Sequence, residues 1–117
     1  MGSLTTHVLD TVSGEPAAGL RLELFSIADD TKTFITHQTT NGDGRCDQPL
    51  AEAEQFLVGT YQIEFHVGDY FNKKNKRSET SSFLKIVPIQ FSNTNVDENY
   101  HVPLLVSPFS YSTYRGS

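Results

Sequence analysis

The sequence predicts a single domain with an all-β sandwich fold and one short helix. Three observations lead to this prediction. Apolar and polar residues alternate with a period of two in many short segments, turn-forming residues separate these segments, and the period becomes helical only once. The chain has 117 residues, of which 37% are hydrophobic and 20% charged, so residues 1–117 suit one folded domain. About eight short strands in this arrangement are typical of a β-sandwich.

The N-terminal part of the chain contains three predicted strands. Their expected bounds are Leu4–Leu9, Leu20–Ile27 and Phe34–Thr40. In the second strand leucines alternate with charged residues, which is typical of a strand with one buried face. The segment Asn41–Gly44 then reads N-G-D-G, which predicts a tight turn with positive φ. Arg45–Pro49, directly after this turn, is a candidate for a short fourth strand.

The middle of the chain holds the clearest strand and the predicted helix. In Tyr61–Val67, apolar residues occupy every second position without interruption. Asp69 is a suitable cap for a short helix from Tyr70 to about Lys76, because lysines near its end match the helix dipole. Leu84–Phe91 returns to the strand pattern, and Pro88 within it predicts an edge strand or a bulge.

The chain closes with a predicted hairpin that is unusually apolar and aromatic for a terminus. Its strands are expected at Tyr100–Ser107 and Ser110–Arg115, with a corner at Pro108 and Phe109. Strand alternation places His101 on the opposite face from Tyr100. A hairpin that carries histidine, serine, tyrosine and arginine indicates a site.

Composition excludes several classes of function. The net charge of -5 argues against nucleic acid as a partner, because phosphates repel an acidic surface. No apolar run approaches the roughly 20 residues of a membrane span, and the N-terminus lacks the charged and apolar regions of a signal peptide. Cys46 is the only cysteine, which fits a reducing compartment. We therefore expect a cytoplasmic protein, with the peroxisome and the periplasm as alternatives.

Four histidines are the main candidates for chemistry: His7, His37, His66 and His101. None has the spacing of a metal motif, so we expect no metal. His37 and His66 are interpreted as solvated polar positions on their strands. His7 and His101 lie among apolar or β-branched neighbours, where a polar group needs a partner. The pattern alone favours a structural and a site histidine equally, and it favours a surface charge for Arg45.

Four motifs connect the chain to a known family. They are Leu4–Asp10 (LTTHVLD), Asp43–Arg45 (DGR), Tyr100–Leu105 (YHVPLL) and the terminal Tyr111–Ser117 (YSTYRGS). Together these motifs resemble those of the 5-hydroxyisourate hydrolases, the transthyretin-related family of purine-degrading enzymes. The resemblance covers essentially the whole chain in order, and the terminal Y-R-G-S is the family's signature.

The resemblance implies a fold, an assembly and a reaction. The fold would be a transthyretin-like β-sandwich of two four-stranded sheets. The assembly would be a homotetramer with its sites at the dimer–dimer interface. The reaction would be hydrolysis of 5-hydroxyisourate, a small purine-derived substrate, to 2-oxo-4-hydroxy-4-carboxy-5-ureidoimidazoline, without metal or cofactor. The catalytic residues would be His7, Arg45 and His101, and Tyr114, Arg115, Gly116 and Ser117 would bind the substrate.

This residue set suits the hydrolysis of an amide. A histidine can take a proton from water and return it to the leaving nitrogen, and an arginine can stabilise an anionic oxygen. Which of the two histidines, His7 or His101, is the general base stays open. The alternative function is a transthyretin-like carrier of a small aromatic ligand, because a sandwich fold does not by itself establish catalysis.

Overall fold

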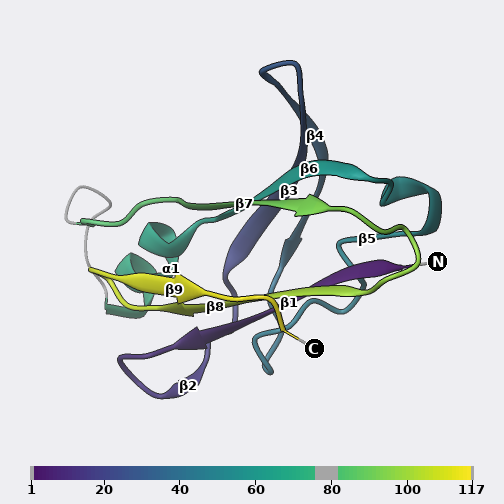
Figure 1. The fold of residues 1–117 in the computed structure, drawn as a ribbon. Coiled ribbons are helices and arrows are strands. Elements are labelled where there is room, and N and C mark those ends of the chain that lie inside the picture. Colours follow the sequence, from purple (N-terminus) through teal and green to yellow (C-terminus); the bar gives the residue numbers. More distant parts are fainter. Residues whose placement is uncertain (1, 76–81, 117) are drawn as a thin grey trace.

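The computed structural model describes residues 2–75 and 82–116 of the chain. These residues form two β-sheets that stack face to face, with helix α1 (Val67–Asn75) at one end of the sandwich (Figure 1). The predicted fold class, an all-β sandwich with one short helix, is confirmed for this part of the chain. No helix within it combines the length and apolarity needed to cross a bilayer.

The second sheet has four strands, as predicted, but the first has five, because the short β5 (Ala51–Glu52) also pairs with β1 (Ser3–Asp10). The first has the order β2-β1-β8-β9 and consists, besides β5, of β1, β2 (Glu15–Pro16), β8 (Tyr100–Val106) and β9 (Tyr111–Thr113). A 3-10 helix follows β5 at Ala53–Gln55. The second sheet has the order β4-β3-β6-β7 and consists of β3 (Arg21–Ala28), β4 (Thr31–Thr39), β6 (Gly59–Phe65) and β7 (Val87–Asn93).

The segment Arg45–Pro49 is not the predicted strand. Only Arg45 pairs with a strand, through an isolated bridge to His7. The reason is local, because the side-chain oxygen of Asn41 accepts hydrogen bonds from the backbone N–H groups of Asp43 and Arg45. These bonds, at 2.9 and 3.2 Å, curl the backbone into a loop.

Helix α1 begins earlier than predicted. It starts at Val67, and the N–H of Tyr70 donates to the carbonyl of His66. Asp69 therefore lies inside the first turn, where the helix dipole favours a carboxylate, instead of capping the helix. The predicted end at Lys76 falls outside the described residues.

Strand β7 forms an edge of the second sheet, which confirms the prediction from Pro88. Pro88 has no N–H to donate, so it is tolerated where one side of the strand has no neighbour. The strand itself begins at Val87, later than the predicted Leu84.

The core lies between the two sheets. It is formed by the inward-facing side chains of both, which alternate with outward-facing ones along each strand. Its largest fully buried members include Leu4, Val8, Leu22, Leu24, Ile63, Phe65, Leu104 and Val106. Burial of each such side chain contributes about 1.5–3 kcal/mol, so the core dictates which face of every strand points outward.

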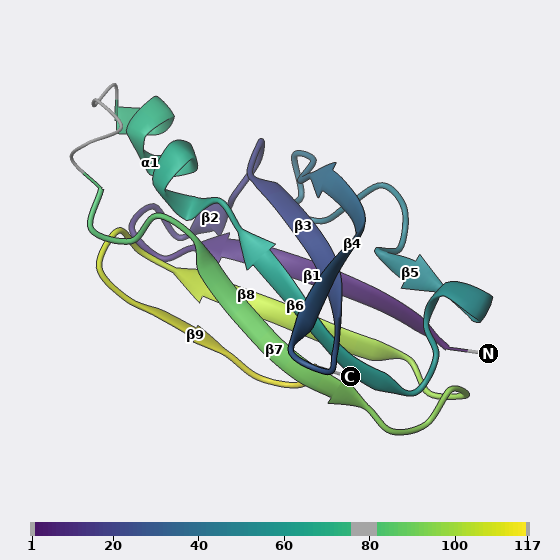
Figure 2. The same cartoon turned by 90° about the horizontal axis from the view of Figure 1, so that it is seen from above.

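The parallel pairing of β1 with β8 brings the two ends of the chain together. It matches Leu4 with Tyr100 and continues in register to Asp10 and Val106. Figure 2 shows the two strands side by side along the sandwich. Residues separated by 96 positions in the sequence therefore become direct neighbours, and the outer face of this strand pair carries both His7 and His101.

Candidate active site

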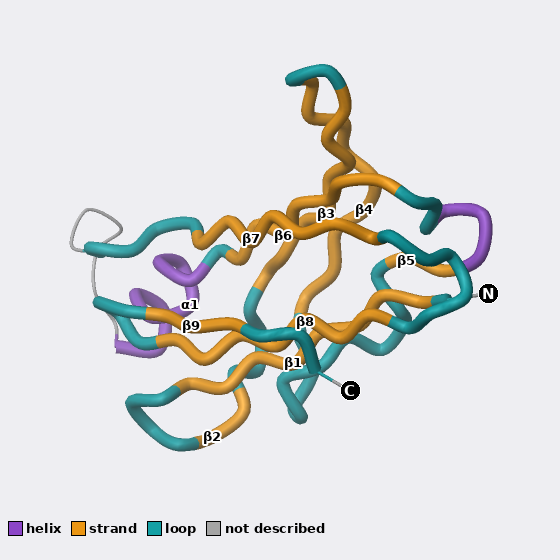
Figure 3. The backbone as a smooth tube through the Cα atoms, in the orientation of Figure 1, coloured by secondary structure: helices purple, strands orange, loops and turns teal. Residues whose placement is uncertain are grey.

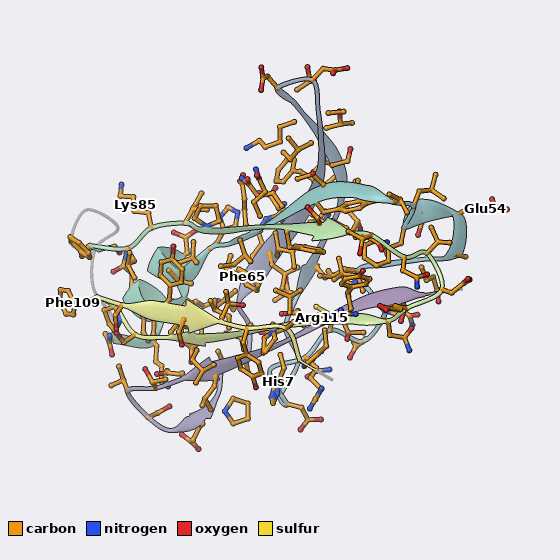
Figure 4. All side chains as sticks on the ribbon, in the orientation of Figure 1. His7, Glu54, Phe65, Lys85, Phe109 and Arg115 are labelled. Atoms are coloured by element: carbon orange, nitrogen blue, oxygen red, sulfur yellow. The ribbon has the colours of Figure 1, made fainter. Side chains whose placement is uncertain are left out.

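His7 and His101 lie on the outer face of the first sheet. On β1, Leu4, Thr6 and Val8 are buried in the core, so Thr5 and His7 point outward. Figure 4 shows His7 on the side of this sheet that faces away from Phe65 in the core. On β8, Val102 and Leu104 are buried and His101 is half-buried on the other face. In the parallel register His101 is opposite Thr5, and His7 is opposite Pro103.

Arg45 reaches this face through the loop that follows β4, which passes below the first sheet in Figure 3. The N–H of Val8 donates to the carbonyl of Gly44 at 2.9 Å, and Arg45 forms its bridge with His7. Gly44 has a φ of 74°, and a Cβ built on it would lie 2.5 Å from the carbonyl oxygen of Val8. Only glycine therefore lets the loop approach β1 this closely.

The C-terminal segment reaches the same place by a backbone contact. The N–H of Gly116 donates to the carbonyl of His101 at 2.7 Å, and the two residues form an antiparallel bridge. A Cβ on Gly116 would lie 2.5 Å from Cδ2 of the His101 ring, so the backbone of Gly116 lies directly against the imidazole. Four segments of the chain thus contribute His7, Arg45, His101 and Gly116 to one surface.

The surroundings of His101 favour its neutral form. Burial lowers the pKa of this imidazole below its ordinary value of 6.5, and the charges of Arg45 and His7 lower the pKa further. Its Nδ1 is 2.9 Å from the hydroxyl oxygen of Thr5. A neutral imidazole close to a permanently charged guanidinium can accept a proton at neutral pH.

A small cleft opens beside this cluster. It has a volume of about 120 Å³ and is lined by Thr5, Thr6, Arg45, Cys46 and Gln48. Burial raises the pKa of the Cys46 thiol to about 11, so this sulfur is protonated at neutral pH. Because the thiolate is the reactive form of cysteine, Cys46 does not supply a nucleophile to the site.

Arg115 and Tyr114 do not join the histidines within one chain. The guanidinium of Arg115 lies over the ring of Tyr100 at 4.1 Å from its centroid, and it donates to Glu98 and to the carbonyl of Asn99. Tyr100 is on the core-facing side of β8, so Arg115 occupies the opposite face from His101. Tyr114 is exposed. The predicted site residue Ser117 lies outside the described residues.

The other two histidines contact charged side chains at the second sheet. His66 is half-buried, and its Nε2 is 2.9 Å from the carboxylate of Glu23, so it is not the solvated position expected from the pattern. His37 is exposed and contacts Arg21 at 3.2 Å. Neither approaches the cluster on the first sheet. No group of three or more His, Cys, Asp and Glu side chains in the described residues is arranged to hold a metal.

A cavity larger than this cleft lies elsewhere in the molecule. It has a volume of about 470 Å³ between helix α1 and β3, and its lining includes Arg21, His66 and Lys74. Each of these side chains already contacts a carboxylate: Arg21 and His66 contact Glu23, and Lys74 contacts Asp10. Lys73 also lines this cavity and forms no ion pair within the part of the chain that the structure describes, so the lining keeps an unpaired positive charge.

Comparison with known proteins identifies the family of this chain. A family model described as the HIUase/Transthyretin family matches residues 4–116, which include all four segments of the cluster. The chain belongs to the HIUase/Transthyretin family. One curated relative is "5-hydroxyisourate hydrolase 2" from Rhizobium meliloti (strain 1021), which is 49% identical over 116 residues. The match covers 99% of this chain and 97% of the relative.

Solved structures similar to this family member include a synthase and a transthyretin in complex with thyroxine. A crystal structure of (S)-allantoin synthase matches with a TM-score of 0.90 and 42% identity over 99% of this chain. This chain spans 44% of the length of that one. Sea bream transthyretin in complex with thyroxine matches with a TM-score of 0.85 and 28% identity, over 97% of this chain and 94% of the other. The fold is therefore shared across the family, and the side chains of the site must distinguish the functions.

Proposed function

We propose that this protein is an enzyme that hydrolyses 5-hydroxyisourate to 2-oxo-4-hydroxy-4-carboxy-5-ureidoimidazoline. The observation that carries the proposal is the convergence of His7, Arg45 and His101 on one outward-facing surface. The full-length similarity to the Rhizobium meliloti hydrolase supports it. The proposed reaction needs no cofactor, since water is the nucleophile.

In the proposed mechanism His101 is the general base. Its lowered pKa leaves it unprotonated at neutral pH, so it can take a proton from water as the water oxygen attacks the ring carbonyl carbon. The carbon–nitrogen bond of the cyclic amide then breaks, and the leaving nitrogen receives a proton from the protonated imidazole. The product carries the new carboxyl group. His7 is proposed to bind the attacked carbonyl or the water, and its bridge with Arg45 supports this role.

Arg45 is proposed to stabilise negative charge in this reaction. A guanidinium carries a positive charge and offers several donors in one plane. These donors suit both an electron-rich purine-derived ring and the oxyanion that forms when water adds to the carbonyl. Arg45 also lines the cleft beside the histidines, where a small planar ring can lie against it.

We further propose a homotetramer in which the sites lie at the dimer–dimer interface. The outer face of the first sheet carries Pro103, Leu9 and Leu105, which are buried or half-buried without a second sheet above them. A partner chain on this face would enclose the cleft. Tyr114, Arg115, Gly116 and Ser117 are proposed to complete substrate binding in this assembly, and the compartment is proposed to be the cytoplasm.

The second candidate function is the carriage of a small aromatic ligand. The similarity to transthyretin in complex with thyroxine favours it, with a TM-score of 0.85. Against it stands the cluster itself, because a carrier has no need of an imidazole held neutral beside an arginine. Ligand binding without turnover would be its signature.

A direct test follows the ultraviolet absorbance of freshly prepared 5-hydroxyisourate with and without the protein. We expect the protein to accelerate the decay, and His101→Ala to reduce the acceleration by about 10²-fold or more. His37→Ala is the matched control, because His37 lies on the other sheet. Equal decay rates with and without the wild-type protein would refute the proposed function.

A further inference from the structure

The hydroxyl of Thr5 makes a contact that the fold of the strand does not require. Thr5 is exposed on the outer face of β1, directly opposite His101, and its Oγ1 is 2.9 Å from Nδ1 of that imidazole. The adjacent Thr6 differs, since its buried hydroxyl must donate to the carbonyl of Val102 at 2.6 Å. An exposed hydroxyl can be satisfied by water, so its contact with His101 points to a role in the site.

Gly116 confines the same ring from another edge. Its backbone is so close to the imidazole that a Cβ would lie 2.5 Å from Cδ2 and 3.2 Å from Cγ. The φ of Gly116 is not in the left-handed region, so glycine is needed here for space and not for backbone conformation. The ring is thus held at Nδ1 by Thr5 and at Cδ2 by Gly116, which leaves the edge with Nε2 without a hydrogen-bond partner among the described residues.

We propose that Thr5 and Gly116 are positioning residues that hold the His101 imidazole in one orientation, so that only its Nε2 exchanges protons with the substrate or water. This inference rests on the proposed hydrolase function for its consequence in turnover. Its structural content, a ring held in one orientation and one tautomer, can be tested without substrate.

The positions of the hydrogens on the imidazole explain why a hydroxyl suits position 5. In the neutral base Nδ1 carries the hydrogen and donates to Oγ1 of Thr5, while Nε2 presents its lone pair. When Nε2 takes a proton from water, Nδ1–H keeps the same bond, so the ring does not turn during the reaction. A carboxylate would also accept this bond, but its charge would stabilise the imidazolium and weaken the bias toward the neutral base.

The test compares Thr5→Val, Thr5→Ser and the control Thr33→Val. Thr33 is an exposed threonine in β4 of the other sheet. We expect Thr5→Val to lower kcat by about 3–10-fold with little change in KM, which corresponds to the loss of one hydrogen bond. Thr5→Ser keeps the hydroxyl and should restore most of the turnover, and Thr33→Val should leave it unchanged.

The ¹⁵N shifts of the His101 ring give the readout that a purely structural role would not change. In the wild type we expect one dominant tautomer with hydrogen on Nδ1, and in Thr5→Val a mixture of the two tautomers. Gly116→Ala should displace the ring and disturb the same signals. In the Gly116→Ala background, Thr5→Val should lower kcat by less than it does in the wild-type protein.

Two results would overturn the inference. One is a His101 tautomer that Thr5→Val leaves unchanged, and the other is hydrogen on Nε2 in the wild type. If the wild-type protein fails to hydrolyse 5-hydroxyisourate, the proposed function fails, but the ring shifts still decide whether Thr5 and Gly116 position His101.

Discussion

His101 illustrates how single residues set the chemistry of this site. Three effects act on its imidazole: partial burial desolvates it, and Arg45 and His7 place positive charge beside it. All three effects disfavour the imidazolium, because each one makes a further positive charge more costly. At neutral pH the imidazole is therefore unprotonated and can accept a proton.

This environment predicts the pH dependence of turnover. Since the pKa of His101 is lowered below 6.5, a base at this position stays unprotonated as the pH falls to that value. We expect kcat/KM to remain level between about pH 8 and pH 6.5 and to fall below it as the imidazole gains a proton. The measurement is kcat/KM against pH, and a fall that begins above pH 7 would contradict His101 as the base.

Arg45 is also predicted to resist conservative replacement. Lysine keeps the charge but loses the planar set of donors, so Arg45→Lys should lower kcat/KM by about 10²-fold. Arg21→Lys on the other sheet is the control, because the guanidinium of Arg21 contacts only His37 and Glu23 among the described residues. Steady-state kinetics check this, and similar losses in both variants would assign the effect to charge or stability.

At the scale of elements, the loop between β4 and β5 controls whether Arg45 reaches β1. Its approach depends on Gly44, which combines a positive φ with a close contact to the carbonyl of Val8. Gly14 provides a natural comparison, because it has a φ of 76° with no atom near its missing Cβ. Alanine at Gly14 therefore tests backbone strain alone, whereas alanine at Gly44 tests backbone strain together with the close approach to Val8.

We predict different outcomes for alanine at these two glycines. Gly14→Ala should cost about 1–2 kcal/mol of folding free energy, the cost of a left-handed conformation, with turnover unchanged. Gly44→Ala should cost more and should also lower turnover, because the loop must move away from β1. Denaturant unfolding and kinetics measure both. A Gly44→Ala variant with full activity would show that the position of Arg45 tolerates this movement.

The attachment of helix α1 to β1 depends on a buried carboxylate. Asp10 is fully buried and accepts hydrogen bonds from Tyr70 at 2.9 Å and from Lys74 at 2.8 Å. Burial alone would raise the pKa of Asp10, but the bonds from Lys74, Tyr70 and two backbone N–H groups lower it below 3.8. A carboxyl group with a depressed pKa stabilises the fold above its unfolded pKa.

This network predicts how stability responds to acid. The contribution of Asp10 should be complete above about pH 4 and should disappear as the pH falls through the lower, folded-state pKa. Asp10→Asn should remove this dependence and cost about 1.5–3 kcal/mol at neutral pH, since Lys74 loses its charged partner. Asp97→Asn, at an exposed site, is the control. Equal stability curves for both variants from pH 2 to pH 7 would contradict the prediction.

At the scale of the whole molecule, the two ends of the chain form one surface. β1 and β8 pair in parallel, and β9 and Gly116 follow on the same sheet. This arrangement leaves Leu9 and Leu105 half-buried on an outer face that has no covering layer within one chain. A half-buried apolar face beside the cleft suits an interface between copies of the chain.

The proposed tetramer makes a measurable prediction on this face. Leu105→Glu should shift the particle toward smaller species in light scattering and lower turnover, while circular dichroism shows an intact fold. Thr33→Glu, on the other sheet, should keep the assembly unchanged. A wild-type protein that is monomeric at micromolar concentration and fully active would refute the proposed location of the site between dimers.

Much of the fold could be predicted because its signals are local. Alternation identified the strands that include Leu22 and Ile63, and a proline identified the edge strand β7. The short strands β2 and β5 are not predicted from the sequence, since two-residue strands carry no periodicity. The predictions of the helix start and of a strand at Arg45–Pro49 are wrong, because side-chain hydrogen bonds and the end of a neighbouring strand decide such boundaries.

The sequence by itself determined the strand pattern, the family membership and the identity of His7, Arg45 and His101 as candidates. Only the tertiary structure decided that β1 lies parallel to β8, that Thr5 contacts His101 and that Arg115 turns to the opposite face. The physical reason is the distance along the chain over which each effect acts. Alternation and turn chemistry act between neighbours along the chain, whereas the choice of a partner 96 residues away is made by the shared core that both strands must cover.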